Sequence, residues 1–258
     1  MSSRTRTAPG ISVVIPAMNE ERNLPHLAER MPRGLREIIV VDGNSADRTV
    51  AVARELWPAA TIVGQTRRGK GNALACGFAV ATGEIIVTLD ADGSTDPAEI
   101  PDFADALLRG ADYAKGSRFR DGGGSADITP LRRRGNDMLN RYANLSFGAR
   151  FTDLCYGYNA FWRHCLHAMD LPPIGATRPQ WGDGFEIETL MNVRVAKAGL
   201  TIAEVASFES ERIHGVTNLN TFRDGLRVLS TIQQERGRSR GTAHPTGRAG
   251  LRPRPVRP

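Results

Sequence analysis

Short apolar runs alternate with segments of helical pattern over the first 120 residues of the chain. The runs at residues 11–16, 37–41, 61–63 and 85–89 are rich in Ile and Val, which is typical of buried strands. Between them, apolar side chains recur at helical spacing. We expect helices opening at Asn19 and spanning 47–57, 73–81 and 97–108, and a further strand over 111–116. This order predicts β-α-β units, and so an α/β domain with a mostly parallel sheet flanked by helices.

Two carboxylates stand where the run at 85–89 ends. Asp90 and Asp92 are one residue apart and precede Gly93 and Pro97, which favour a turn. Because a parallel strand ends at the carboxyl edge of its sheet, both acids are expected at the edge where open α/β sheets bind ligands. Hard oxygen ligands suit Mg²⁺ or Mn²⁺. The alternative is a pair of solvated acids that cap the next helix.

Polar residues also follow the other predicted strands. Asn19 and Glu20 follow the first strand, Asp42 follows the second, and Lys70 lies in a glycine-rich loop after the third. Brought together at one edge, carboxylates and a lysine suit a nucleotide with a diphosphate and a bridging metal. Taken singly, Asp42 is typical of a helix-capping acid and Lys70 of a solvated loop.

The pattern changes after residue 120. A glycine-rich segment at 121–125 precedes a predicted helix over 131–147, and Arg132, Arg133 and Arg134 lie at the start of that helix. Basic side chains there oppose the helix dipole, so a bound anion is expected near them. Leu139, Leu145, Phe147 and Phe151 form either core or an apolar surface for landing on a membrane.

The composition excludes several classes of protein. The formal net charge of +6 comes from the C-terminus, because residues 236–258 hold seven arginines and no acids, whereas residues 1–235 hold 27 basic and 28 acidic side chains. We predict a flexible N-terminus over 1–10, one domain over 11–235 and a disordered basic tail over 236–258. The three cysteines indicate neither a zinc site nor a disulfide framework. No apolar run suits a membrane span or a secretory signal, so we expect a cytoplasmic protein, peripheral on the inner face of the membrane if the tail binds anionic lipid.

Several motifs together resemble a family 2 glycosyltransferase of the GT-A fold. They are ISVVIPAMNEE at 11–21, IIVVDGNSADRT at 38–49 and LDADG at 89–93. Later segments are similar to the dolichyl- or polyprenyl-phosphate mannose synthase branch of that family: GSRF at 116–119, DLCYG at 153–157, GDGFEIE at 182–188 and ERIHGVTNL at 211–219. The resemblance covers about residues 11–230.

The resemblance implies roles for particular residues. Pro16, Asn19, Glu20 and Asp42 would line the nucleotide pocket, with Lys70 adding positive charge, and Asp90 and Asp92 would hold the metal and the donor diphosphate. Arg118 and Arg212, joined by Arg133 or Arg134, would face the acceptor phosphate or the leaving diphosphate, and Glu188 would lie near the sugar. The predicted catalytic residues are therefore Asp92, Arg118, Glu188 and Arg212.

Two departures from the family pattern affect the interpretation. The usual pair of acids after the second strand is Asp42-Gly43 here, which leaves one carboxylate. The Gly-x-Ser-Lys of many relatives is Gly215-Val-Thr-Asn218, so a phosphate-binding lysine is missing. The missing lysine weakens the prediction of the acceptor more than the prediction of the metal.

The resemblance implies metal-dependent, inverting transfer of a sugar from a GDP- or UDP-sugar to a polyprenyl phosphate. Such an acceptor is already anionic and needs no protein base, whereas a hydroxyl acceptor would need one. The candidates for that base are Asp153, Asp183, Glu186 and Glu188. Two alternatives stay open: a small soluble or hydroxyl acceptor, and a non-catalytic nucleotide or nucleic-acid binder using the basic tail. We expect no nucleic-acid partner, because carboxylates without a metal repel phosphates.

Overall fold

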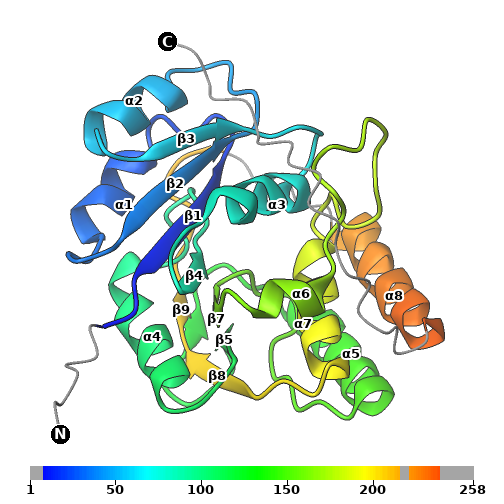
Figure 1. Ribbon diagram of the computed structural model, residues 1–258. Helices are drawn as coiled ribbons and strands as arrows, with labels where there is room; N and C mark the ends of the chain where they lie inside the picture. The colour runs from blue at the N-terminus through cyan, green and yellow to red at the C-terminus, as the bar shows by residue number, and fades with distance from the viewer. Residues whose placement is uncertain (1–7, 216–220, 239–258) are drawn as a thin grey trace, which may run out of the picture.

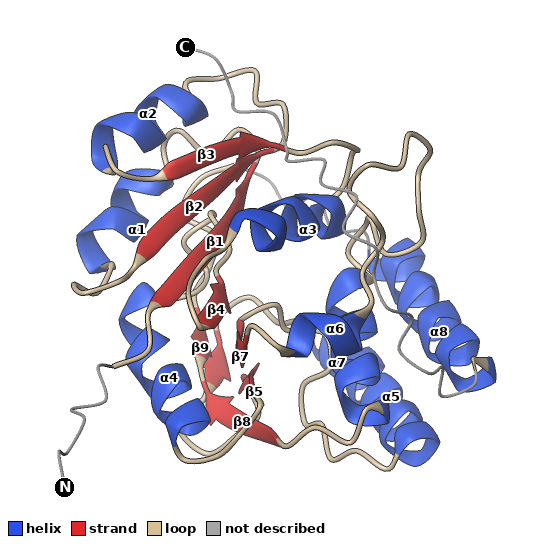
Figure 2. Ribbon diagram, in the orientation of Figure 1, coloured by secondary structure: helices blue, strands red, loops and turns tan. Residues whose placement is uncertain are grey.

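A seven-stranded sheet forms the centre of the molecule (Figures 1 and 2). The structure is a computed structural model that describes residues 8–215 and 221–238. The sheet comprises β1 (Ile11–Ala17), β2 (Glu37–Asp42), β3 (Thr61–Gly64), β4 (Ile85–Thr88), β5 (Tyr113–Ser117), β7 (Asn159–Trp162) and β8 (Ile202–Ala206). Their order is β3-β2-β1-β4-β7-β5-β8. All neighbours are parallel except β7, which runs antiparallel to β4 and β5, so the predicted mostly parallel sheet is confirmed.

Helices cover both faces of the sheet because the strands are apolar on both sides. On one face pack α1 (Leu24–Arg30), α2 (Thr49–Leu56) and α4 (Ile100–Leu108), the last preceded by a 3₁₀ turn, η1 (Pro97–Glu99). On the other face pack α3 (Lys70–Val80), α6 (Cys165–Met169) and α7 (Ile187–Lys197). The single predicted α/β domain with flanking helices is therefore present.

A third layer lies outside α7. The helices α5 (Pro130–Phe147) and α8 (Thr221–Gly237) pack together through a small apolar cluster that includes Leu139, Phe151 and Ile232. The helix α8 also contacts α7, because Arg194 and Lys197 of α7 form ion pairs with Glu235 of α8. A separate two-stranded parallel ribbon pairs β6 (Gly124–Ser125) with β9 (Phe208–Glu209). Among the described residues, no helix combines the length and apolar character that crossing a bilayer requires.

The structure corrects some details of the sequence prediction. The first helix begins at Leu24 rather than Asn19, because Asn19 adopts a left-handed conformation (φ 60°) that ends any helical path through it. The strands β7 and β8 were not anticipated. Leu139 and Phe151 are core residues, so of the suggested landing surface only Leu145 is strongly exposed. Most of the predicted N-terminal segment (1–10) and basic tail (236–258) lies outside the described residues.

Candidate functional site

A cavity of about 1040 Å³ opens at the carboxyl edge of the sheet. The ends of β1, β2, β4 and β5 all contribute to its wall, as expected where parallel strands end together. Eight of the residues predicted from sequence line it: Pro16, Glu20, Lys70, Asp90, Asp92, Arg118, Glu188 and Arg212. Residues far apart in the chain therefore meet at one edge of the sheet, as expected for residues that follow parallel strands.

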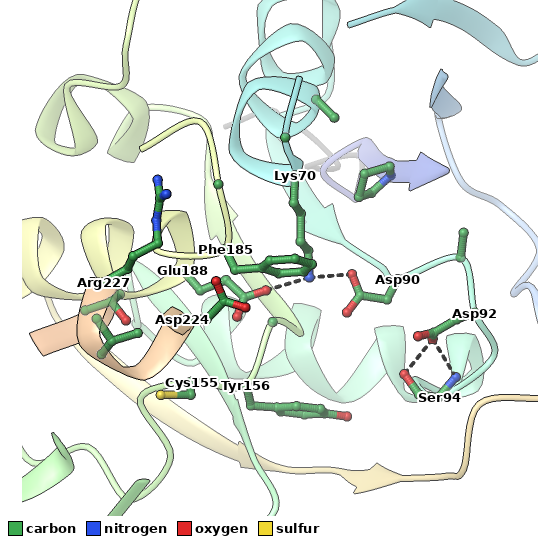
Figure 3. A pocket seen from close by; sticks show the side chains of 18 of the residues that line it. Lys70, Asp90, Asp92, Ser94, Cys155, Tyr156, Phe185, Glu188, Asp224 and Arg227 are labelled. Atoms are coloured by element: carbon green, nitrogen blue, oxygen red, sulfur yellow. Dashed lines mark hydrogen bonds and ion pairs between the residues drawn. The ribbon is translucent and has the colours of Figure 1, made fainter. Parts of the chain in front are cut away.

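Lys70 lies between two carboxylates in the lining of this cavity (Figure 3). Its Nζ is 2.6 Å from Asp90 Oδ1 and 2.5 Å from Glu188 Oε1. Burial lowers the pKa of Lys70, but the two carboxylates outweigh burial, so its pKa lies above the ordinary value and the ammonium stays charged. Burial also raises the pKa of Glu188, against the opposing pull of Lys70. Gly157 leaves room for this pair, since a Cβ there would lie 2.3 Å from Glu188 Oε1.

Arg212 makes a second bridge between acids on the other side of the cavity. Its Nη1 donates to Glu20 Oε1 at 3.0 Å, and its Nη2 lies 2.9 Å from Asp92 Oδ2. The other oxygen of Asp92 accepts from the backbone N–H and the hydroxyl of Ser94, which fixes the carboxylate (Figure 3). Burial raises the pKa of Glu20, although Asn23 and Arg212 counter it. Each of the paired acids of the sequence motif thus holds one basic side chain.

These acids fit a divalent cation. Within the described ranges no three acidic, histidine or cysteine side chains converge on one point, so a cation here would take two carboxylates, Asp90 and Asp92, and obtain its other ligands from phosphate and water. Mg²⁺ is commonly bound in that way, and both side chains offer hard oxygens into the cavity. If all groups are ionised, Glu20, Asp90, Asp92 and Glu188 exceed Lys70 and Arg212 by two negative charges. A divalent cation would balance this excess.

The four candidate bases are each paired with a basic side chain. Asp153 is fully buried and accepts from Arg118 Nε at 2.7 Å and Nη2 at 2.9 Å. Asp183 pairs with Arg67, Glu186 with Arg227, and Glu188 with Lys70. Asp153 does not line the cavity, in keeping with a structural acid that pairs with an arginine.

Arg118, which the GSRF motif predicted to face a phosphate, is buried. Its third donor, Nη1, reaches Glu209 Oε2 at 2.9 Å, so carboxylates occupy both sides of the guanidinium. Burial lowers its pKa, but Asp153 and Glu209 outweigh burial and raise the pKa above its ordinary value. The anions that Arg118 meets in this structure are therefore the protein's own.

Arg67 builds the cavity wall instead of contacting its contents. Its guanidinium makes two hydrogen bonds to Asp183, at 2.8 and 2.7 Å, and donates to three backbone carbonyls between residues 173 and 176. This clamp positions the segment that carries Pro179, Gln180 and Phe185 along the cavity. The next residue, Arg68, is exposed and lines the cavity.

Four predicted site residues lie outside the cavity lining. Asn19 and Asp42 hold the loops after β1 and β2 together: Asn19 accepts from the backbone N–H of Ala46, and Asp42 from that of Ser45. Arg133 lies over the ring of Phe119 at 5.1 Å, and Arg134 is exposed. At the start of α5, Arg132 lines the cavity and pairs with Asp127, which supplies an anion near this helix terminus.

Sequence reasoning missed the part of the wall that α8 supplies. Asp224 and Arg227 of α8 line the cavity (Figure 3). Arg227 lies over the ring of Trp181 at 5.3 Å and pairs with Glu186. No motif marked these residues. Tyr156, by contrast, also lines the cavity and lies in the DLCYG segment, which resembles the mannose synthase branch, so the sequence held a signal for it.

Comparison with known proteins agrees with this geometry. The family model described as Glycosyl transferase family 2 matches residues 12–168, which is more than half of the chain. The chain belongs to this family. As a family 2 glycosyltransferase it has the GT-A-like fold, a mostly parallel sheet between two layers of helices, that the sequence motifs implied.

Two curated relatives extend the match beyond the family domain. The glycosyltransferase AglJ of Haloferax volcanii is 32% identical over 224 residues, covering 85% of this chain and 69% of that protein. Polyprenol monophosphomannose synthase of Mycolicibacterium smegmatis is 32% identical over 218 residues, covering 81% and 80%. The resemblance to the polyprenyl-phosphate mannose synthase branch is therefore confirmed at the level of homology.

Solved structures show the same fold. A crystal structure of glucosyl-3-phosphoglycerate synthase from Mycobacterium tuberculosis, in complex with Mn²⁺, UDP and glucosyl-3-phosphoglycerate, superposes with a TM-score of 0.66 at 24% identity. The match covers 89% of this chain and 80% of that one. At this identity the likeness concerns the fold.

Proposed function

We propose that this glycosyltransferase moves a sugar from a nucleotide-sugar donor to the phosphate of a polyprenyl phosphate, with inversion and with a divalent cation bound. The observation that carries the proposal is the placement of Asp90 and Asp92 in the cavity, each already holding a basic side chain. The cation, held by these two carboxylates, would neutralise charge on the departing diphosphate.

Lys70 and Arg212 are the basic groups in contact with Asp90 and Asp92, the proposed cation ligands. Each is paired with one acid of the Asp90-Ala-Asp92 motif and one acid outside it. When a cation and a diphosphate bind, both side chains can turn from Asp90 and Asp92 toward phosphate oxygens while they keep Glu188 and Glu20 as partners. Preorganised positive charge where negative charge develops is a large source of catalysis.

The pairing of the candidate bases favours a phosphate as the acceptor. A hydroxyl acceptor needs a carboxylate that can take its proton. Asp153, Asp183 and Glu186 each pair with an arginine, however, and Glu188 pairs with Lys70. A phosphate monoester has a second pKa of about 6, so it arrives as an anion at neutral pH and attacks without a base. Homologous enzymes named for polyprenyl-phosphate substrates support this choice of acceptor.

One assay tests the proposal. The full chain is incubated with Mn²⁺ or Mg²⁺ and a panel of GDP- and UDP-sugars, with polyprenyl phosphate, a small phosphorylated acceptor or a sugar hydroxyl acceptor in separate arms. We expect nucleoside diphosphate release that requires both the cation and the polyprenyl phosphate, and a product of inverted anomeric configuration. Equal nucleoside diphosphate release in the presence of EDTA would contradict the proposed metal dependence. Preference for either of the other acceptors would contradict polyprenyl phosphate as the acceptor.

A further inference from the structure

The helix α5 carries an exposed apolar stripe that no other described element covers. Leu131, Met138 and Leu145 are 62%, 64% and 87% exposed. They are spaced by seven residues, so they lie on one line along the helix. The buried side of the same helix is formed by Leu139, Ala143 and their neighbours, roughly opposite this line. We call Leu131, Met138 and Leu145 the α5 stripe.

The α5 stripe begins at the cavity. Leu131 lines the cavity, whereas Met138 and Leu145 lie one and two heptads further along α5, toward its C-terminal end. The helix itself lies at the outer edge of the molecule (Figure 1). The exposed apolar side chains of α5 therefore run from the cavity to the surface.

Basic side chains lie beside the α5 stripe. Arg134 and Arg141 are exposed and follow the stripe at the same spacing of seven residues, on one side of it. Arg133 is also exposed on α5, and Asp137 contributes one opposing charge between them. A helix with an apolar line bordered by arginines is typical of helices that lie in the interface of an anionic membrane.

We propose that the α5 stripe seats the enzyme on an anionic lipid surface, so that the cavity receives a polyprenyl phosphate from that surface. This inference rests on the proposed function. A second copy of the chain is a poorer occupant, because a two-fold contact through the stripe would bring the arginines of both copies together. The C-terminal segment 239–258 is also poorer, because its five arginines would meet Arg134 and Arg141.

The test measures vesicle binding of the full chain. Wild type and the double variant Met138→Gln/Leu145→Gln are floated with vesicles of phosphatidylcholine containing 30% phosphatidylglycerol. Neither substituted residue lines the cavity. Leu108→Gln, at another exposed leucine (57%) on α4, is the control. We expect the double variant to lose at least about tenfold in lipid partitioning, since two apolar side chains leave the interface, and Leu108→Gln to bind as wild type does.

A second pair of variants tests the charge. Arg134→Gln/Arg141→Gln should lose about fivefold per arginine on anionic vesicles and nothing on neutral ones. The proposal is overturned if wild type does not bind the anionic vesicles, if the Met138/Leu145 variant binds them as wild type does, or if that variant only converts a dimer to a monomer in sedimentation.

Sugar transfer to a short-chain, water-soluble prenyl phosphate separates this proposal from the proposed function. The Met138/Leu145 variant should keep wild-type turnover with that acceptor and lose turnover with long-chain acceptor in vesicles. If neither protein transfers sugar to any phosphate acceptor while the difference in vesicle binding persists, the proposed function fails and the docking surface stands.

Discussion

Lys70 Nζ lies 2.6 Å from Asp90 Oδ1, so the first acid of the Asp-Ala-Asp motif is neutralised by a lysine from the N-terminus of α3. The same nitrogen contacts Glu188 of α7. A basic side chain therefore already lies where a divalent cation is proposed to bind. Cation binding at Asp90 must then compete with Lys70.

Asp92→Asn should remove nearly all turnover and leave the fold intact. The substitution keeps the shape of the side chain and its contact with Ser94 but removes the charge that faces Arg212 and the proposed cation. Loss of one group that stabilises developing charge costs about 10²–10³ in rate. Steady-state assays with Mn²⁺, alongside circular dichroism of both proteins, measure this. Undiminished metal-dependent transfer by the variant would exclude the assignment.

Glu188→Gln should weaken apparent Mn²⁺ affinity by about tenfold. Losses of this size are expected for a residue that does not bind the metal but supports a residue that does. Without Glu188, Lys70 pairs with Asp90 alone and competes more strongly with the cation. Titration calorimetry at pH 7 compares the two proteins.

The same pair predicts a pH dependence. The pKa of Glu188 is raised above 4.5 by burial, so wild-type Glu188 becomes neutral as the pH falls through that raised value. Mn²⁺ affinity of wild type should therefore fall toward that of Glu188→Gln over this range, and the two proteins should converge at the acidic end. Parallel pH profiles would show that Glu188 does not control Asp90 through Lys70.

Arg67→Met should destabilise the protein by about 3 kcal/mol, because it leaves Asp183 buried without a counter-charge. For a domain of this size the expected fall in Tm is about 6–12 °C. Arg68→Met is the control: Arg68 is the next residue and is exposed, so its effect should stay within about 0.5 kcal/mol. Thermal unfolding distinguishes the two. Equal losses of stability in the two variants would mean that the bonds from Arg67 to residues 173–183 do not stabilise the fold.

Arg227→Met should cost about 1–2 kcal/mol at pH 7, since the arginine is partly exposed whereas its partner Glu186 is not. Burial raises the pKa of Glu186, but Arg227 and backbone N–H groups outweigh burial and hold the pKa below 4.5. The contribution of the pair is thus complete above pH 4.5 and is lost as the pH falls through the lowered pKa. Urea unfolding at pH 7 and near pH 3 should show the difference shrinking. Arg236→Met, exposed on the same helix, should show no such change.

Much of the site could be predicted from sequence because strand ends in a parallel sheet meet at one edge. The buried runs of β1, β2 and β4 are readable from local pattern, and their topology then brings Glu20, Asp90 and the residues after β3 into one cavity. The motif order gave the family without any knowledge of contacts. Local pattern also located α5, including its three successive arginines.

The partners of the charged residues depended on the tertiary structure. Arg118 and Arg212 have the sequence context of phosphate ligands, yet Arg118 is enclosed by Asp153 and Glu209, and Arg212 bridges Glu20 and Asp92. These pairs join residues 35 to 192 positions apart, and no local pattern encodes such separations.

The fold class, the family and the two acids after β4 could thus be read from the amino-acid sequence, because they follow from local hydrophobicity and short motifs. Three features depend on the packing of distant segments: Lys70 joins Asp90 to Glu188, α8 supplies part of the cavity wall, and Leu145 is exposed while Leu139 is buried. The physical reason is that burial and ion pairing are set by what packs against a side chain, and those neighbours come from distant parts of the chain.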